Sequence, residues 1–290
     1  MTSDQVARFG KIKRVLVIVL ALNWAVALAK IIFGLATRFN SMAADGFHSL
    51  SDGASNIIGL IGITLACRPA DKDHPYGHKK YETFFTLGIA ALLFFVCYEI
   101  LAGAIERFHN PVIPEINIGS LLVMLATTAV NIFVMKYEYR QGRRLNSDIL
   151  VSDSMHTKAD IFTSLSVIAA IVVIKMGYPI LDPVVTVIIA IFIAYAAFSI
   201  ARQSSNVLCD TIMVDEKKVE GIVLSVKGVK ACHKIRTRGR EDDIYVDLHV
   251  QVSPEMHVDR AHQVSYEIEG AIKAKIPGVT DVVVHIEPKR

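Results

Sequence analysis

The sequence predicts an α-helical membrane domain of six transmembrane helices, followed by a small α+β cytoplasmic domain. Three observations support this fold class. Hydrophobic residues make up 52% of the chain, charged residues only 20%, and the mean hydropathy is +0.43. Long apolar runs dominate the chain up to about residue 200, whereas no later run is long enough to span lipid. We therefore assign residues 1–205 to the membrane domain and residues 206–290 to the second domain.

The apolar runs define six predicted spans, each near the ~20 residues that a hydrocarbon core requires. They cover residues 15–36, 42–66, 83–105, 117–137, 149–175 and 181–200. Basic residues concentrate before the first span, between the second and third, and after the fourth. The positive-inside rule then predicts that both termini and the C-terminal domain are cytoplasmic. The net charge of +3 reflects this topology, and no basic surface interleaved with aromatic residues indicates nucleic acid as a partner.

Spans two and five carry the same polar motif, H-x-x-x-D-x-x-[ST], inside apolar sequence. Its members are His48 and Asp52 in span two, and His156 and Asp160 in span five. Residues four apart lie side by side on a helix. Because the two spans cross from opposite faces, the ~1.5 Å rise per residue brings both pairs close to the membrane midplane. Ionisable residues at this depth are costly and indicate a functional site.

Two imidazoles and two carboxylates suit tetrahedral coordination of Zn²⁺, with Fe²⁺, Co²⁺ and Cd²⁺ as further candidates. The alternative is that each histidine only hydrogen-bonds to its neighbour and ties helices together. Asp45 and Asp153 lie one turn from these histidines. We interpret them as residues on the access route, or as hydrogen-bond partners of the ligands.

The cytoplasmic part has a helix–strand–strand–helix–strand pattern. The predicted elements are a helix from about 213 to 226, strands at 230–238 and 243–252, a helix at 258–275 and a strand at 280–287. The stretch "IYVDLHVQV" alternates apolar and polar residues, as expected of a half-buried strand. This order favours a small sheet with helices on one face.

The paired motifs resemble the transport site of the cation diffusion facilitators, most closely the bacterial YiiP-like zinc exporters, and the resemblance runs nearly end to end. It implies four transport ligands: His48, Asp52, His156 and Asp160. In the loop "RPADKDHPYGHKKYE" it implies a second metal site formed by Asp71, His74 and His78. In the last domain it implies metal ligands at His233, His249, His262, His285 and Glu287.

Two positions depart from the family pattern. YiiP-like members often have aspartate in place of His48, and an aspartate is more common in place of Glu287, whose longer side chain alters the geometry of a bridged two-ion site. Alternative interpretations remain for the loop residues and for the histidines of the last domain. The loop can be a solvated turn, and the cytoplasmic histidines can be surface residues without metal.

The resemblance implies proton-coupled export of a divalent transition metal, with Zn²⁺ as both the transported and the regulatory ion. It implies a homodimer formed through a ferredoxin-like cytoplasmic domain, in lipid of the bacterial inner (plasma) membrane. Protons and metal compete for the same lone pairs, because histidine must be neutral and aspartate ionised to coordinate. The alternatives are a membrane metalloenzyme and a metal sensor without transport. No HExxH motif and no candidate nucleophile accompany the ligands, so we do not expect an enzyme.

Overall fold

The structure is a computed structural model that describes residues 3–36, 49–50, 53–109, 118–175 and 181–289. The chain divides into two compact units, Met1–Ser204 and Ser205–Arg290.

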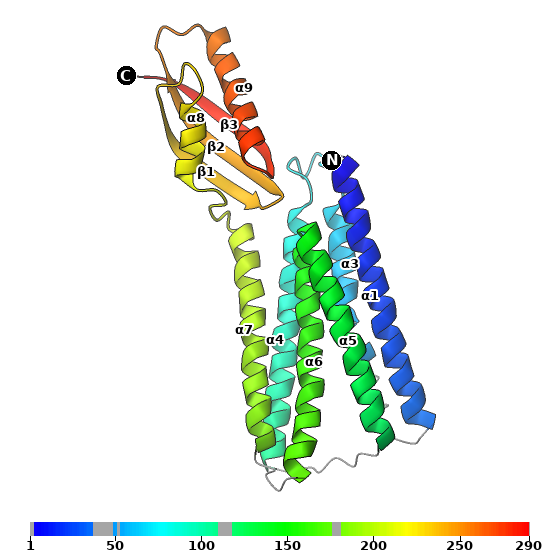
Figure 1. Ribbon diagram of the computed structural model, residues 1–290. Coiled ribbons are helices and arrows are strands. Elements are labelled where there is room, and N and C mark those ends of the chain that lie inside the picture. The colour runs from blue at the N-terminus through cyan, green and yellow to red at the C-terminus, as the bar shows by residue number, and fades with distance from the viewer. Residues whose placement is uncertain (1–2, 37–48, 51–52, 110–117, 176–180, 290) are drawn as a thin grey trace. The chain divides into compact units, whose positions relative to one another are not determined.

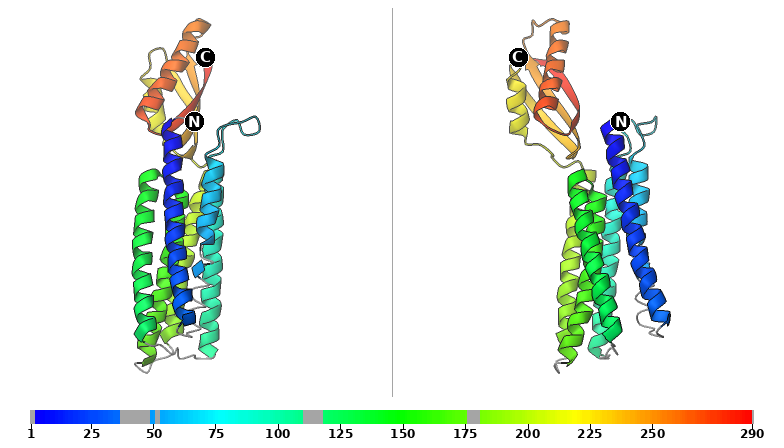
Figure 2. Two further views of the ribbon diagram at one scale, coloured as in Figure 1. Left: turned by 90° about the vertical axis from the view of Figure 1, so that its right-hand side faces the viewer. Right: turned by 45° about the vertical axis from the view of Figure 1, so that its right-hand side comes forward.

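The first unit is a bundle of helices that run alongside one another (Figures 1 and 2). Its described helices are α1 (Ser3–Ala36), α3 (Ala54–Ala66), α4 (Lys80–His109), α5 (Ile118–Leu145), α6 (Asp148–Lys175) and α7 (Leu181–Leu208). Helix α6 packs against α3, α4 and α5. One apolar cluster joins α1, α3, α4, α5 and α6, and a second joins α4, α6 and α7. The bundle is therefore organised around α6.

The bundle has an apolar exterior and a partly polar interior. Large apolar side chains are exposed along α4 and α7, including Phe95, Phe192 and Tyr195. Ser55, Asn56, Asp153, Ser154, His156 and Thr157 are all buried. In water an apolar exterior of this kind would be unfavourable, whereas lipid solvates it. This polarity agrees with the predicted helical membrane domain.

Three of the described helices are long and apolar enough to cross a membrane by length and composition. The stretches are Ala7–Ile32 in α1, Lys80–Glu106 in α4 and Thr186–Leu208 in α7. Helix α6 carries Asp153, Lys158 and Asp160 among its apolar residues. The described part of α3 has only 13 residues.

The second unit has the predicted αββαβ order: α8 (Glu216–Leu224), β1 (Ala231–Arg240), β2 (Asp243–Val252), α9 (Val258–Lys275) and β3 (Val279–Pro288). Asp215 caps α8 by accepting a hydrogen bond from the Lys217 backbone N–H at 2.8 Å. The sheet order is β1-β2-β3, with β1 antiparallel and β3 parallel to β2.

Both helices cover one face of this sheet. Val246, Leu248 and Val250 of β2 share an apolar core with residues of α8 and α9. Since side chains alternate along a strand, the residues between them, Tyr245, Asp247, His249 and Gln251, lie on the opposite face, which neither helix covers. The alternation in the sequence predicts this division, and the fold class is confirmed. The uncovered face therefore carries polar side chains, His249 among them.

Candidate metal centres

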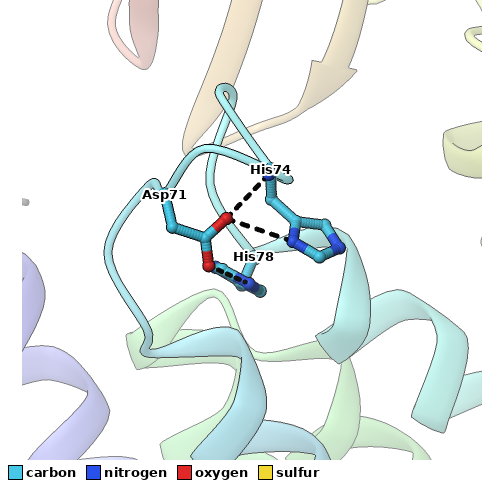
Figure 3. A group of neighbouring side chains, drawn as sticks. All are labelled: Asp71, His74 and His78. Atoms are coloured by element: carbon cyan, nitrogen blue, oxygen red, sulfur yellow. Dashed lines mark hydrogen bonds and ion pairs between the residues drawn. The ribbon is translucent and has the colours of Figure 1, made fainter.

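The loop between α3 and α4 brings Asp71, His74 and His78 together. One oxygen of Asp71, Oδ1, accepts a hydrogen bond from the His74 backbone N–H at 2.7 Å and lies 3.3 Å from His74 Nδ1. Its other oxygen, Oδ2, lies 3.4 Å from His78 Nε2. Figure 3 shows the carboxylate facing both rings, whose centroids are 4.3 Å apart. One potential ligand atom from each residue falls within 4.8 Å of the others.

The loop holds this arrangement through its backbone. The Asp71 N–H donates to the His74 carbonyl, and the Gly77 N–H donates to the same oxygen. His78 is fixed because its Nδ1 lies 3.0 Å from the Pro69 carbonyl oxygen, and its side chain is only 5% exposed. The backbone hydrogen bond from His74 lowers the pKa of Asp71 below its usual value, so the carboxylate is ionised at neutral pH. An ionised carboxylate beside two imidazoles can bind a divalent ion and leaves a coordination position open.

The uncovered face of the cytoplasmic sheet carries a second group of ligand-type side chains. In the strand register His233 of β1 is opposite His249 of β2, and His249 is opposite His285 of β3. Glu287 joins them: its Oε1 lies 2.7 Å from His249 Nδ1, and its Oε2 lies 3.2 Å from His233 Nε2. His285 Nε2 is farther, at 3.7 Å from Glu287 Oε1. His233, His249 and Glu287 can offer ligand atoms within 4.8 Å of one another.

The electrostatics of this group centre on Glu287. Its hydrogen bond with His249, together with the nearby His233, lowers the pKa of Glu287 below the usual value. The longer side chain, relative to the aspartate more common in the family, reaches back along the sheet to both histidines.

A β-bulge in β1 places His233 in this group. Between the pairs His233–His249 and Arg236–Asp247, two residues of β1 oppose one of β2, and Lys234 has a φ of 50°. His233 and Arg236 are three residues apart and would point to opposite faces of a regular strand. The extra residue in β1 lets both point to the same face, as their partners His249 and Asp247 do. The uninterrupted strand predicted at 230–238 therefore omits a feature that the cluster needs.

His262 lies apart from these strand histidines. It is exposed on α9, the helix that packs on the other face of the sheet. The centroid of its ring lies 4.7 Å from that of the Tyr266 ring. A single chain thus does not bring His262 together with Glu287. His257 caps α9, its Nδ1 accepting a hydrogen bond from the Asp259 backbone N–H.

Half of the predicted intramembrane quartet is described. His156 is 4% exposed, and Asp160 lies half-buried one turn further along α6. His48 and Asp52 lie outside the described residues, as does Asp45. The quartet as a ligand set therefore stays a prediction.

A chain of polar side chains lies one turn from His156. The Asn23 side-chain amide of α1 donates to Asn56 Oδ1 at 3.0 Å, and Asn56 Nδ2 donates to Asp153 Oδ2. Glu138 of α5, which is fully buried, contacts Asp153. Asp153 is predicted from the sequence as a residue on the access route or as a hydrogen-bond partner of the ligands, whereas Glu138 is not predicted, because it lies just beyond the fourth predicted span. Its acidic character next to an apolar run is the only signal that indicates it.

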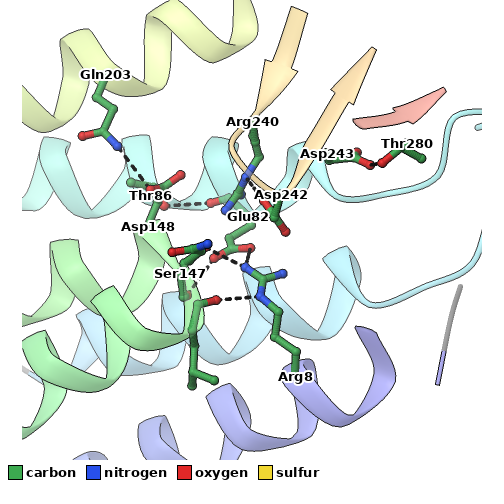
Figure 4. Close-up of polar contacts among 12 residues, drawn as sticks. Arg8, Glu82, Thr86, Ser147, Asp148, Gln203, Arg240, Asp242, Asp243 and Thr280 are labelled. Atoms are coloured by element: carbon green, nitrogen blue, oxygen red, sulfur yellow. Dashed lines mark hydrogen bonds and ion pairs between the residues drawn. The ribbon is translucent and has the colours of Figure 1, made fainter. Parts of the chain in front are cut away.

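A second polar network, which the sequence does not predict, links the ends of α1, α4 and α5. Arg8 of α1 donates from Nε to the Leu145 carbonyl at 2.6 Å, and from an Nη to the Asn146 carbonyl at 2.7 Å. Figure 4 shows the same guanidinium facing Glu82 of α4, at 3.7 Å. Glu82 also accepts a hydrogen bond from Ser147 Oγ at 2.7 Å. The positive-inside rule explains the charge of Arg8 but not this role as a link between helix ends.

An apolar helical bundle with buried ligand-type residues, joined to a small domain with a histidine–carboxylate cluster, defines an integral membrane protein with candidate metal sites. Comparison with known families specifies it further. Residues 16–209 match the cation efflux transmembrane domain, and residues 213–289 match the cytoplasmic domain of cation efflux proteins. The chain therefore belongs to the cation efflux family, the cation diffusion facilitators, and is a divalent metal transporter and not an enzyme.

Individual relatives span almost the whole chain. An uncharacterized transporter of Methanocaldococcus jannaschii is 31% identical over 96% of this chain and 98% of its own length. The manganese efflux system protein MneP of Bacillus subtilis is 27% identical over 95% of this chain and 96% of its own. The cation-efflux pump FieF of Shewanella oneidensis is 28% identical over 89% of this chain and 88% of its own.

Proposed function

We propose that this protein exports Zn²⁺ from the cytoplasm in exchange for protons, and that His48, Asp52, His156 and Asp160 bind the ion tetrahedrally within the membrane. The proposal rests on the family and on one contact in the structure, the hydrogen bond from Asn56 of α3 to Asp153 of α6.

This contact puts Asn56 of α3 at the level of Asp153 of α6. Helices α3 and α6 run antiparallel, because α3 ends at the loop end of the bundle where α6 begins (Figure 1). Asp52 precedes Asn56 by four residues, and His156 follows Asp153 by three. At ~1.5 Å per residue, a helical path through residue 52 would bring Asp52 about 6 Å beyond Asn56. That level falls between His156 and Asp160, which lie about 4.5 and 10.5 Å beyond Asp153.

The mixed donor set supports zinc as the ion. Imidazole nitrogen suits Zn²⁺, Fe²⁺ and Co²⁺, whereas Mn²⁺ prefers sites made of oxygen. Manganese is the second candidate, because MneP, a relative along nearly the whole chain, carries manganese efflux in its name. Cd²⁺, Fe²⁺ and Co²⁺ are the remaining candidates for the transported ion.

Proton exchange follows from the chemistry of the ligands. Each histidine must lose its proton and each aspartate must be ionised before the metal binds. Two carboxylates without metal in lipid would take up protons, because isolated charge is costly there. Metal and protons would therefore occupy the site alternately as the bundle opens to each side.

The same proposal covers topology and regulation. The chain would cross the bacterial inner membrane six times, with both termini in the cytoplasm. The cytoplasmic domains would pair two copies of the chain, and zinc at His233, His249, His285 and Glu287 would tighten the pair. The Asp71 loop would hold a further, exchangeable ion.

Transport in proteoliposomes tests the proposal. Purified protein is reconstituted with a pH-sensitive dye in the lumen, and Zn²⁺, Mn²⁺, Cd²⁺, Fe²⁺ or Co²⁺ is added outside at two pH values. We expect zinc uptake accompanied by alkalinisation of the lumen, and loss of both in Asp52→Ala and Asp160→Ala. Glu106→Ala, an exposed acid of α4, serves as the matched control and should transport normally. Normal flux in both aspartate variants would refute the quartet.

The test also separates the alternative functions. Metal-dependent dimerisation without flux would favour a sensor. A flux of metal without a pH change would retain export but refute proton coupling.

A further inference from the structure

We propose that Glu138 and Asp153 form a second intramembrane site for a divalent cation, between His156 and the end of the bundle that carries the α5–α6 turn. Only its role on the transport route depends on the function proposed above.

The two carboxyl groups are buried and touch each other. Glu138 is 0% exposed and Asp153 is 1% exposed. They come from neighbouring helices, α5 and α6, and lie close enough to repel each other when both are ionised. Counting back from the turn, Glu138 is seven residues before Leu145, and Asp153 is five after the start of α6 at Asp148. At ~1.5 Å per residue both therefore lie about 8–10 Å inside the bundle.

Most of their oxygen atoms have no protein partner. Among the described residues, no donor reaches either oxygen of Glu138 or Oδ1 of Asp153. Only Asp153 Oδ2 is satisfied, by Asn56 Nδ2, and the Asn56 amide is itself oriented by the hydrogen bond from Asn23. Three carboxyl oxygens thus remain available in one buried place. A buried polar atom without a partner costs about 1–3 kcal/mol, and a buried charge costs more. Such an arrangement favours a ligand that supplies positive charge.

The charge balance favours a divalent cation. Two carboxylates carry a formal charge of −2, and no basic side chain of the described residues forms an ion pair with either. One shared proton would leave one negative charge buried, whereas one divalent ion neutralises both. The donor set consists only of oxygen atoms, and carboxylate oxygen suits Mn²⁺ and Mg²⁺ more than softer ions. The site would therefore bind Mn²⁺ at least as well as Zn²⁺, in contrast to the histidine-containing quartet.

The position of Glu138 and Asp153 suits a site that the ion occupies before it reaches His156. Asp153 precedes His156 by one helical turn on α6, and both are buried. An ion held by Glu138 and Asp153 would reach the quartet by moving about one turn along α6, a rise of ~4.5 Å.

Binding of Mn²⁺ to the full-length protein in detergent tests the site directly. Bound and free Mn²⁺ are separated by electron paramagnetic resonance across a titration. We expect the double variant Glu138→Gln, Asp153→Asn to lose one bound ion per protomer, and Glu106→Gln to lose none. Elution volume and melting temperature check that each variant is folded. An unchanged stoichiometry in the folded double variant would overturn the proposal.

A measurement on the unmutated protein avoids any dependence on folding of the variants. A membrane-permeant carbodiimide modifies buried carboxyl groups, and mass spectrometry quantifies the products at Glu138 and Asp153. We expect Mn²⁺ to protect both residues and to leave Glu106 unprotected. Equal labelling with and without Mn²⁺ would indicate a pair that holds only a proton, and the proposal would be wrong.

Asp160→Asn separates this proposal from the proposed function. It should abolish zinc flux yet retain the Mn²⁺ ion that the double variant loses. If Asp160→Asn transports normally, the quartet fails while the second site is still judged by its Mn²⁺ count. If Asp160→Asn loses that same ion, the Glu138–Asp153 site is not independent and the inference falls.

Discussion

Glu287 acts as the common partner of the cytoplasmic histidines. One carboxylate uses its two oxygens on two different imidazoles, at 2.7 and 3.2 Å. The contacts cross all three strands, so a single side chain links the edges of the uncovered face. An aspartate at this position would be one methylene shorter and would reach fewer of these nitrogens without a shift of the strands.

Cys232, the neighbour of His233, is predicted to be a poor nucleophile. Burial, and then the charges of Glu220 and Glu216, raise the pKa of its thiol to about 11. At pH 8 about one molecule in a thousand would be thiolate, roughly two hundredfold less than for an unperturbed thiol with a pKa of ~8.5. Alkylation by iodoacetamide, followed by mass spectrometry, should therefore be much slower at Cys232 than at the exposed Cys209. The Cys232 rate should rise about tenfold per pH unit until pH 11; a plateau near pH 9 would contradict the prediction.

At the scale of elements, close contacts fix how α6 and its neighbours approach one another. Gly142 of α5 faces α6 so closely that an added Cβ would lie 2.9 Å from the Val151 backbone nitrogen. Arg8 closes the same end by binding the carbonyls of Leu145, the last residue of α5, and of Asn146, which follows it. Carbonyls in the last turn of a helix need partners from outside that helix, and a cation near a helix C-terminus is also favoured by the helix dipole. The turn that aligns Glu138 with Asp153 is therefore fixed from outside α5 and α6.

Removal of Arg8 should destabilise this end of the bundle. Arg8→Ala would remove the guanidinium that lies 3.7 Å from Glu82, a carboxylate that is only 1% exposed. We expect a loss of about 1.5–3 kcal/mol of unfolding free energy, the range for hydrogen bonds to charged groups. Denaturant unfolding of the detergent-solubilised protein measures it. Arg14→Ala, at an exposed position of the same helix, is the control, and equal stability of the two variants would disprove the role of Arg8.

The contact of α3 with α4 depends on a glycine. An added Cβ at Gly62 would lie 2.5 Å from Phe85 Cβ, an atom next to the backbone that cannot move away alone. Gly62→Ala should therefore cost about 1–3 kcal/mol through overpacking, despite the better helix propensity of alanine. Gly10→Ala in α1 meets nothing within 4 Å and should keep or raise the melting temperature. A melting temperature for Gly62→Ala at or above the wild-type value would contradict this expectation.

At the scale of the whole molecule, the chain consists of two units with separate cores. The apolar core of the cytoplasmic unit is built entirely from residues between Met213 and Ile286. The candidate metal site formed by His233, His249 and Glu287 also lies wholly within that unit. Folding and metal binding of this part should therefore not require the bundle.

The cytoplasmic fragment 205–290 should fold alone and bind zinc. We expect Glu287→Gln to weaken zinc binding at least tenfold, because it removes the carboxylate shared by His233 and His249. His262→Ala should leave the affinity and stoichiometry unchanged, because His262 lies on α9. Isothermal titration calorimetry measures both, and circular dichroism checks the fold. If His262→Ala also removes an ion, a second copy of the chain supplies the missing ligands, and the proposed homodimer contributes to the site.

Much of the fold is predictable from the sequence, because hydrophobic periodicity is a local property. The order αββαβ, the two helices on one face of the sheet and the outward direction of His249 and His285 all follow from alternation and composition. The bulge at Lys234 does not follow, because a register shift depends on how two strands pair. Residue type and family resemblance indicate the members of the two candidate metal sites. The distances between the side chains within each site come only from the folded chain.

The sequence by itself determined the class of each element, the family and the candidate ligands, because residue identity and spacing along one helix or strand establish them. Only the tertiary structure decided which faces meet. It alone brings Glu138 against Asp153, Arg8 against the end of α5, and Glu287 between His233 and His249. A local pattern shows that a side chain points inward, but the partner it meets comes from a segment far away in the chain, and packing selects that partner.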